Sequence, residues 1–305
     1  MKLGIKVNAD HDSFARLRDT NPKAVEVWFN ANEPDKYTDL FAEVKQRHCD
    51  VGLHFWGMLD DHIAPNLAYP DESVTKQTLD LMRKTIDIAA SNKFQYVNIH
   101  PGAAAVSRVN YEKQRYDLCK DPVDTDDSIA LFITNARSLH TYAASKGVVL
   151  TVETVPVRIP DGWYDPQARL TPKNIHELPA RAIIQAAQAK LWVANDFCHT
   201  AANVITHDPS AVWSFLLGTT TMLATHTRLI HLGFVIPPYN GSDVHDTLEN
   251  PIFDTDDAVP NKKQMLELLR LFKNRSDIWI LVEPKEDHVK NYFLAQKLLQ
   301  EAAQN

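Results

Sequence analysis

The segment DESVTKQTLDLMRKTIDIAASNKFQYVNIH, residues 71–100, contains a helix followed closely by a strand. Residues 71–92 begin with two acidic side chains, which favour a helix N-terminus, and then carry apolar side chains three or four positions apart. The run QYVNIH at 95–100 is short and contains β-branched and aromatic residues, as expected of a strand buried in a parallel sheet. This order of elements is typical of α/β folds.

The same alternation extends over the whole 305-residue chain. Eight predicted strands separated by helices favour a (β/α)8 TIM barrel, an α/β fold that residues 1–305 would form as a single domain. The predicted strands are residues 2–7, 24–29, 50–55, 95–100, 148–153, 190–196, 228–233 and 278–283. The predicted helices are residues 35–48, 71–92, 126–146, 176–189, 208–225, 261–274 and 288–303.

A doubly wound open sheet is the alternative fold for such an alternation. It usually needs fewer strands, and a dinucleotide-binding version carries a G-x-G-x-x-G turn after the first strand. The sequence at that point is VNADHD, residues 7–12, which contains no glycine. Two proline-rich stretches, residues 155–172 and 235–260, follow the fifth and seventh strands, and we expect them to be long loops on one face of the barrel.

The composition is that of an ordinary globular protein, with 44% hydrophobic residues and a net charge of −7. The negative charge argues only weakly against a nucleic-acid partner, because bound metal ions would add local positive charge. Three cysteines without a C-x-x-C pair favour a reducing compartment. There is no signal-peptide pattern and no apolar run approaching about 18 residues, so we expect a cytoplasmic protein without a membrane partner. The sequence leaves the oligomeric state open.

Side chains that bind metals occur at or near the predicted C-terminal ends of six strands, where barrel enzymes carry their active sites. A single His or Glu at a strand end is more often structural, but nine ionisable groups buried together would be unstable without compensating charge. Divalent cations supply that charge, and imidazole and carboxylate donors suit zinc, manganese or cobalt better than calcium. The nine candidates are His54, His100, Glu153, Asp196, His199, His231, Asp243, His245 and Glu283.

The remaining histidines and the cysteine within this set are expected to be structural. Cys198 lies between Asp196 and His199, and we interpret it as a small buried hydrophobic residue rather than a tenth ligand. We assign the other eight histidines to helices or helix ends, where we expect surface positions. They are His11, His48, His62, His140, His176, His207, His226 and His288.

Several short motifs resemble the endonuclease IV family, also called AP endonuclease family 2, within the xylose-isomerase-like TIM barrels. The resemblance is spread over most of the chain, and the combination is more specific than any single motif. The motifs are VEVWFNANE (25–33), APNLAYP (64–70), NIHPGAA (98–104), LTVET (150–154), NDFCHTAA (195–202), LIHLG (229–233), DVH (243–245) and LVEP (281–284).

The resemblance implies three metal sites. By position, His54, His100 and Glu153 would hold one ion. Glu153 would bridge to a second ion, completed by Asp196, His231 and Glu283. The third ion would be held by His199, Asp243 and His245. The implied activity is a zinc-dependent phosphodiesterase with two or three ions, which hydrolyses a phosphate ester such as the backbone at an abasic site in DNA. Glu153, Glu283 and His199 would be its catalytic residues.

The chain departs from the family pattern at positions that would face DNA. The first strand ends in IKVN (5–8) instead of a His-containing turn, and HFWG (54–57) stands where the family has His-Ala-Pro-Tyr. The glycine-rich turn after the Glu strand is replaced by residues 155–170. HLGFV (231–235) lacks the Asn-Asp that follows the family's His, and DVHDTLENP (243–251) lacks its glycine-rich run. The residues at the implied metal-binding positions match the family, whereas those that would face DNA differ. The departures therefore concern the substrate more than the metals.

The competing interpretation is a sugar or sugar-phosphate isomerase or epimerase of the same superfamily. Glu153, Asp196, His231 and Glu283 would then hold one Mn²⁺, Co²⁺ or Mg²⁺ ion, and Glu153 and Glu283 would act as an acid/base pair. A small sugar would be the substrate, and the aromatic side chains of Trp163 and Tyr164 suit such a pocket. This scheme gives no role to His54, His100, Asp243 and His245.

Overall fold

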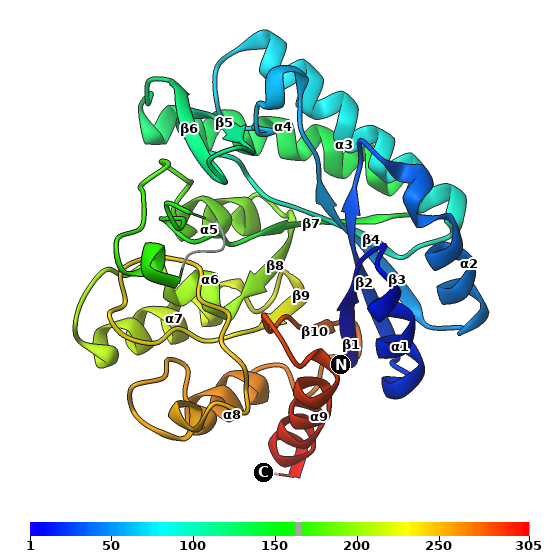
Figure 1. The fold of residues 1–305 in the computed structure, drawn as a ribbon, viewed down its shortest axis with the longest axis vertical. Coiled ribbons are helices and arrows are strands. Elements are labelled where there is room, and N and C mark those ends of the chain that lie inside the picture. Colours follow the sequence, from blue (N-terminus) through cyan, green and yellow to red (C-terminus); the bar gives the residue numbers. More distant parts are fainter. Residues whose placement is uncertain (163–165, 305) are drawn as a thin grey trace.

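A computed structural model describes residues 1–162 and 166–304 of the chain. Its centre is a closed barrel of eight parallel strands surrounded by helices, which confirms the predicted (β/α)8 TIM barrel (Figure 1). The strands follow one another around the barrel in the order β1-β10-β9-β8-β7-β4-β3-β2. They are β1 (Lys2–Val7), β2 (Ala24–Asn30), β3 (Asp50–Trp56), β4 (Tyr96–Ile99), β7 (Val149–Glu153), β8 (Trp192–Asp196), β9 (Thr227–Leu232) and β10 (Trp279–Val282).

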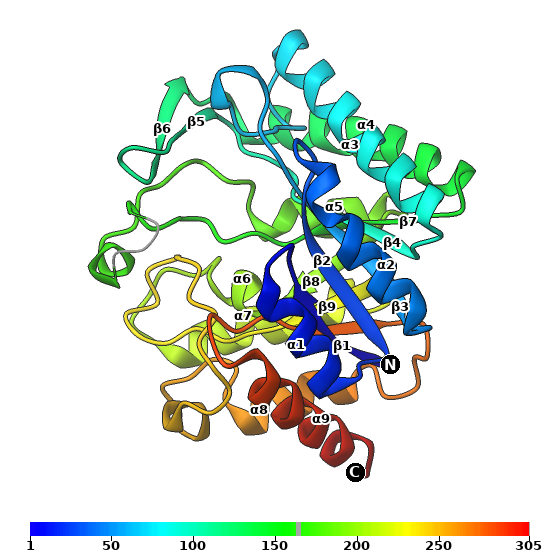
Figure 2. The same cartoon turned by 45° about the vertical axis from the view of Figure 1, so that its right-hand side comes forward.

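Helices cover the outside of the barrel, and the last of them, α9, packs against both α1 and α8 (Figure 2). Among the residues described, no helix combines the length and apolar character needed to cross a bilayer. The α-helices are α1 (His11–Thr20), α2 (Thr38–Gln46), α3 (Glu72–Asn92), α4 (Thr125–Ser145), α5 (Ala180–Gln188), α6 (Phe197–Ala201), α7 (Pro209–Leu223), α8 (Lys262–Arg270) and α9 (His288–Gln304). Short 3₁₀ helices span Pro34–Tyr37, Asp60–His62, Pro166–Leu170 and Pro251–Asp254.

Helix α1 and the start of helix α5 differ from the sequence-based predictions. The sequence pattern predicts no helix between the first two strands, because the α1 segment has few apolar residues. It forms with Asp10 as its N-cap, whose side chain accepts a hydrogen bond from the Ser13 N–H at 2.8 Å. The predicted helix 176–189 starts too early. Helix α5 begins at Ala180, because Lys173 and Glu177 pair with other segments of the chain.

An antiparallel hairpin of β5 (Val106–Asn110) and β6 (Arg115–Lys120) follows β4 and was not predicted. Its turn contains no glycine or proline, so the usual sequence signal for a hairpin is missing. The hairpin lies beside the segment that follows β7, since the Lys173 ammonium donates to the Tyr116 carbonyl oxygen at 2.9 Å. These two insertions together cover one part of the barrel mouth.

The barrel interior contains an apolar layer at the N-terminal ends of the strands. The Tyr96 and Trp279 rings stack there with centroids 4.5 Å apart, and Ala24, Ala194, Leu229 and Leu281 complete the cluster. The polar side chains of the metal-binding motifs lie towards the opposite end of the barrel. Gly52 on β3 allows this packing, because a Cβ atom at its position would lie 2.0 Å from Cζ of Tyr96.

Replacing Gly52 by alanine should therefore destabilise the barrel. The added methyl group must displace the Tyr96 ring, and overpacking of this kind costs about 1–3 kcal/mol in free energy of unfolding. Chemical denaturation measures the loss. Gly218→Ala is the matched control, because Gly218 lies inside α7 and a Cβ atom there would meet no atom within 4 Å. Alanine at this position should stabilise by up to about 1 kcal/mol. Equal stabilities of the two variants would contradict the packing argument.

Candidate metal centre

The strand ends bring the predicted ligand residues to one face of the barrel. His54 lies in β3, His231 in β9, and Glu153 and Asp196 are the last residues of β7 and β8. His100 directly follows β4, and Glu283 directly follows β10. Because parallel strands of a barrel end on the same side, these side chains meet at its C-terminal mouth. The predicted convergence is confirmed as an arrangement in space, while metal binding by these residues stays a prediction.

Helix α6 and the loop after β9 supply the other three residues. The Asp196 carboxylate caps α6 by accepting from the His199 N–H at 2.8 Å, and this fixes the position of His199. The backbone N–H of His245 lies 3.3 Å from Sγ of Cys198, which is fully buried. At Gly233 a Cβ atom would lie 2.8 Å from Cβ of Cys198, so the loop needs glycine there.

The nine residues form three groups of potential ligands, and within each group the ligand atoms lie within 4.8 Å of one another. The first group is His54, His100 and Glu153; the second is Glu153, Asp196, His231 and Glu283; the third is His199, Asp243 and His245. Two further groups overlap with these, namely Glu26, His54 and His231, and Asp196, Cys198 and His245. The predicted division into three sites therefore corresponds to the spatial grouping, and Cys198 is close enough to be an additional ligand.

Glu153 is the centre of the arrangement. Its carboxylate is fully buried, and Oε1 lies 3.1 Å from Nδ1 of His231 and 3.2 Å from Nδ1 of His199. Oε2 lies 3.8 Å from Nε2 of His54 and 3.7 Å from Nε2 of His100. Its two oxygens thus face the first and second groups, which is the geometry required of a bridging carboxylate.

Two charged residues of the centre, Lys6 on β1 and Glu26 on β2, were not among the predicted site residues. Glu26 is fully buried, and its Oε1 lies 3.1 Å from Nδ1 of His54 and 3.0 Å from Nε2 of His231. The Lys6 ammonium pairs with Glu283 and lies 3.4 Å from Glu26. The available signal was a charge in the interior of each of two mostly apolar strands, Lys6 in KLGIKV and Glu26 in AVEVWF.

Carboxylate charge controls the protonation of the histidines. Burial opposes the charged form of His199, but Asp196 and Asp243 outweigh it and raise the pKa of His199 well above its usual value. Burial also opposes the charged forms of His231 and His245. The charge of Glu153 nevertheless raises the pKa of His231, and the charge of Asp243 raises the pKa of His245. The pKa of His54 is lowered, by burial and then by the charge of Lys6. The centre therefore attracts positive charge.

Divalent cations fit this donor set. Five carboxylates converge here, counting Glu26. The Lys6 ammonium pairs with two of them, Glu26 and Glu283, and adds a single positive charge. Oε2 of Glu26 is buried and accepts no hydrogen bond from the described residues, and Oε2 of Glu283 has an ion-pair contact with Nδ1 of His231 at 3.1 Å but likewise accepts no hydrogen bond. Nδ1 of His199 lies 2.9 Å from the Thr154 carbonyl oxygen, which can only accept, so Nδ1 carries a proton. Nε2 of the same ring faces Asp243. The residues are thus oriented as ligands.

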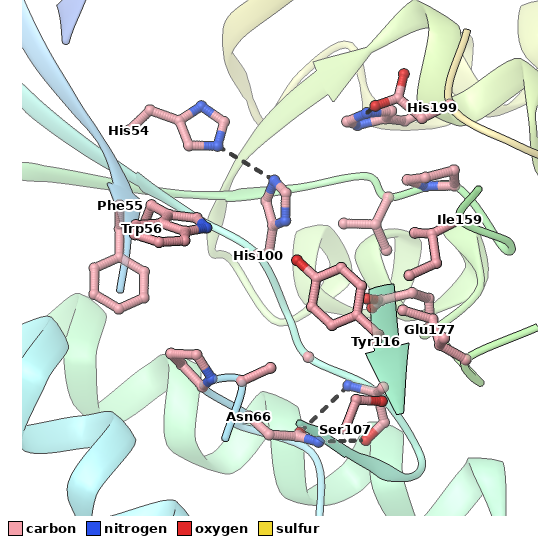
Figure 3. A pocket seen from close by; sticks show the side chains of 18 of the residues that line it. His54, Phe55, Trp56, Asn66, His100, Ser107, Tyr116, Ile159, Glu177 and His199 are labelled. Atoms are coloured by element: carbon pink, nitrogen blue, oxygen red, sulfur yellow. Dashed lines mark hydrogen bonds and ion pairs between the residues drawn. The ribbon is translucent and has the colours of Figure 1, made fainter. Parts of the chain in front are cut away.

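A cavity of about 620 Å³ opens beside the centre, and His54, His100 and His199 form part of its wall. Figure 3 shows these histidines along one side and Tyr116 and Glu177 on the other. The β5–β6 hairpin and the segment after β7 contribute Ser107, Tyr116, Ile159 and Glu177 to the lining. Trp163 and Tyr164, which the isomerase interpretation places in a sugar pocket, lie outside the described residues.

The family profile of xylose isomerase-like TIM barrels matches residues 14–245, which is more than half of the chain. The chain belongs to the xylose isomerase-like TIM barrel family. Members of this family include endonucleases and sugar epimerases or isomerases, so membership indicates a metal-dependent enzyme and leaves hydrolase and isomerase chemistry both open.

The individual proteins to which the chain is similar are named for both activities. The chain is 25% identical over 108 residues to "Probable endonuclease 4" of Natronomonas pharaonis, a match that spans 35% of this chain and 37% of that protein. It shares the fold of a D-tagatose 3-epimerase-like protein with a TM-score of 0.66 and 16% identity, over 100% and 99% of the two chains. Endonuclease IV from Thermus thermophilus gives a TM-score of 0.57 with 13% identity, over the same shares. Endonuclease IV activity in particular is thus not shown by these similarities.

Zinc should stabilise the metal-free protein more strongly as pH rises. The raised pKa values of His199, His231 and His245 stabilise the fold below about pH 6.5, and that contribution is lost as pH rises through the folded-state values. Zinc replaces these protons and competes with fewer of them at higher pH. The rise in Tm on adding zinc to chelator-treated protein should be larger at about pH 8.5 than at about pH 6. A shift that is independent of pH would contradict the assignment of these histidines as ligands.

Proposed function

We propose that the protein is a metal-dependent hydrolase of phosphate esters, with zinc as the first candidate metal and up to three ions bound. The observation that carries the proposal is the sharing of Glu153 between two ligand groups, with a third group, His199, Asp243 and His245, beside them. A single-ion enzyme needs only the second group. Nine ligands at three or four per ion correspond to about three sites, with water completing each.

In this proposal each ligand group has its own place. His54, His100 and Glu153 would hold the first ion, and Glu153, Asp196, His231 and Glu283 the second. His199, Asp243 and His245 would hold the third. Divalent ions bound there would supply the positive charge that stabilises the attacking and leaving oxygens of an in-line displacement at phosphorus.

The chain's own residues would keep these groups in place. Glu26 contacts the ring nitrogens of both His54 and His231, and Asn98 donates a hydrogen bond to Glu153. Such contacts behind a ligand fix its orientation and, for histidine, which nitrogen carries the proton. Lys6 pairs with Glu283 and balances part of the excess negative charge.

The substrate that the cavity favours is a small phosphate ester. The hairpin and the segment after β7 cover part of the mouth and form one wall of a cavity of about 620 Å³, in the range of small-molecule sites. Abasic DNA remains a substrate to be tested, because the metal-binding motifs resemble those of endonuclease IV. An intact DNA duplex would have to pass the β5–β6 hairpin and the segment after β7 to reach the candidate ligands.

A sugar or sugar-phosphate isomerase or epimerase is the second candidate. The same cavity favours it, and so does the second ligand group, which can hold a single Mn²⁺, Co²⁺ or Mg²⁺ ion. Glu153 and Glu283 would then move a proton between neighbouring carbons of the substrate.

The double variant Asp243→Asn with His245→Ala separates the two candidates. In the hydrolase the third group stabilises the transition state, so hydrolysis of bis(4-nitrophenyl) phosphate or of an abasic-site oligonucleotide should fall by ~10²-fold or more. In the isomerase these two residues would hold no metal ion. His245 Nε2 lies 2.9 Å from Oδ2 of Asp196, so the variant loses one contact behind a ligand, and interconversion of ketose epimers should be reduced but persist.

Metal content and Tm of the double variant serve as its controls. The wild type should contain two or three ions by elemental analysis, and the variant should lose one while it keeps the fold. A wild type with one ion after zinc reconstitution, or a variant that retains most of its phosphoesterase activity, would refute the three-ion hydrolase.

A further inference from the structure

Glu177 lies on the wall of the cavity away from the metal centre, beside Tyr116 (Figure 3). Its backbone is held by the segment between β4 and β5, since residue 177 forms a β-bridge with Ala103 and the Ala104 N–H donates to the His176 carbonyl oxygen at 2.8 Å. The Leu178 N–H also donates to the Gly102 carbonyl oxygen at 3.3 Å. The position of Glu177 is therefore fixed by the fold.

The carboxyl group of Glu177 has an unsatisfied oxygen. Oε2 is buried and accepts no hydrogen bond from any described residue, and no described cation lies within ion-pair distance of it. Leaving a buried polar group unpaired is costly, and buried polar atoms in folded proteins nearly always have a partner. A carboxyl group kept in this state at a cavity wall points to a partner that arrives with the ligand.

The surroundings of Glu177 allow both of its protonation states near neutral pH. Burial raises its pKa to about 7, against the opposing charge of His100 and His199, both of which are farther away than an ion-pair contact. The Tyr116 phenol is another ionisable group facing it, and burial and the charge of Glu177 raise the pKa of that phenol to about 12. A ligand group that can both donate and accept a hydrogen bond would pair with either the protonated or the ionised carboxyl group. A hydroxyl group does this without adding a charge to this wall of the cavity.

We propose that Glu177 is a substrate-binding residue that hydrogen-bonds a hydroxyl group on the organic part of the substrate. The inference rests on the proposed function for the phosphate end of the molecule, which would lie at the metal centre. It assigns the substrate to the class of hydroxylated small-molecule phosphate esters. Glu177 stands apart from the nine candidate ligands and belongs to none of their three groups.

Binding of two matched probes tests this assignment without requiring hydrolysis. Ribose 5-phosphate carries hydroxyl groups and n-pentyl phosphate carries none. Zinc-loaded wild type should bind ribose 5-phosphate more tightly by isothermal titration calorimetry. Glu177→Met should lose roughly tenfold or more of that affinity, while binding of n-pentyl phosphate stays the same. Glu177→Gln should keep most of the preference because its amide also donates and accepts.

Glu112→Met is the matched control, since Glu112 is exposed in the turn of the β5–β6 hairpin. An unchanged preference in Glu177→Met would overturn the role of Glu177. If the preference depends on Glu177 but neither phosphate ester nor abasic DNA is hydrolysed, the proposed function is wrong and the binding role stands.

The stability of the unliganded protein gives an independent test. The pKa of Glu177 is raised in the folded state, so its ionisation costs stability as pH rises from about 4.5 to about 7, and the full cost is present above that range. Glu177→Met removes this cost, and its Tm should exceed that of the wild type by about 1–3 °C above about pH 7, with the gain disappearing towards about pH 4.5. A lower Tm than wild type at every pH would show that Glu177 has a structural partner, and the proposal would fail.

Discussion

Convergence of carboxylate charge around Glu153 is the constraint on which the rest of the barrel mouth depends. Glu153, Asp196 and Glu26 are fully buried, and unpaired charges at such positions would destabilise the fold by several kcal/mol each. Imidazoles placed at strand ends, the Lys6 ammonium and the N–H groups of α6 supply compensation from the protein itself. Metal ions of higher charge compensate more fully, which is why this set of side chains is better explained as a ligand set than as a salt-bridge network.

The barrel and its cover come from different parts of the chain. Strand ends, α6 and the loop after β9 provide the nine candidate ligands, whereas the hairpin after β4 and the segment after β7 provide the far wall of the cavity. Loops after barrel strands vary without disturbing the strands themselves. Sequence similarity to endonuclease 4 over part of the chain can therefore coexist with a small-molecule-sized cavity beside the strand ends. The mixed similarities of the chain follow from this separation.

Most of the fold and of the metal centre could be predicted from the sequence, because both depend on regular positions. His100, Glu153 and Asp196 stand at the ends of apolar runs, and the alternation of elements sends such ends to one face. Lys6 and Glu26 were missed because a charge within a strand indicates function only once its inward orientation is known. The hairpin was missed because its turn has no glycine or proline, and Glu177 was assigned to a helix because its pairing with Ala103 joins residues far apart in sequence.

The buried carboxyl groups of this protein have opposite electrostatic surroundings, and this separates their roles. Burial alone would raise the pKa of Glu153, but His231 and His54 hold it well below the usual value, so Glu153 stays ionised and suits a cation. At Glu177 burial is the dominant effect, and no positive group of the described residues opposes it from within contact distance. Glu177 therefore suits neutral hydrogen-bonding partners, and it belongs to none of the residue groups that could hold a metal ion. The two carboxyl groups face the same cavity, and a ligand with an anionic end near the metals and neutral hydroxyl groups at the other end would match both.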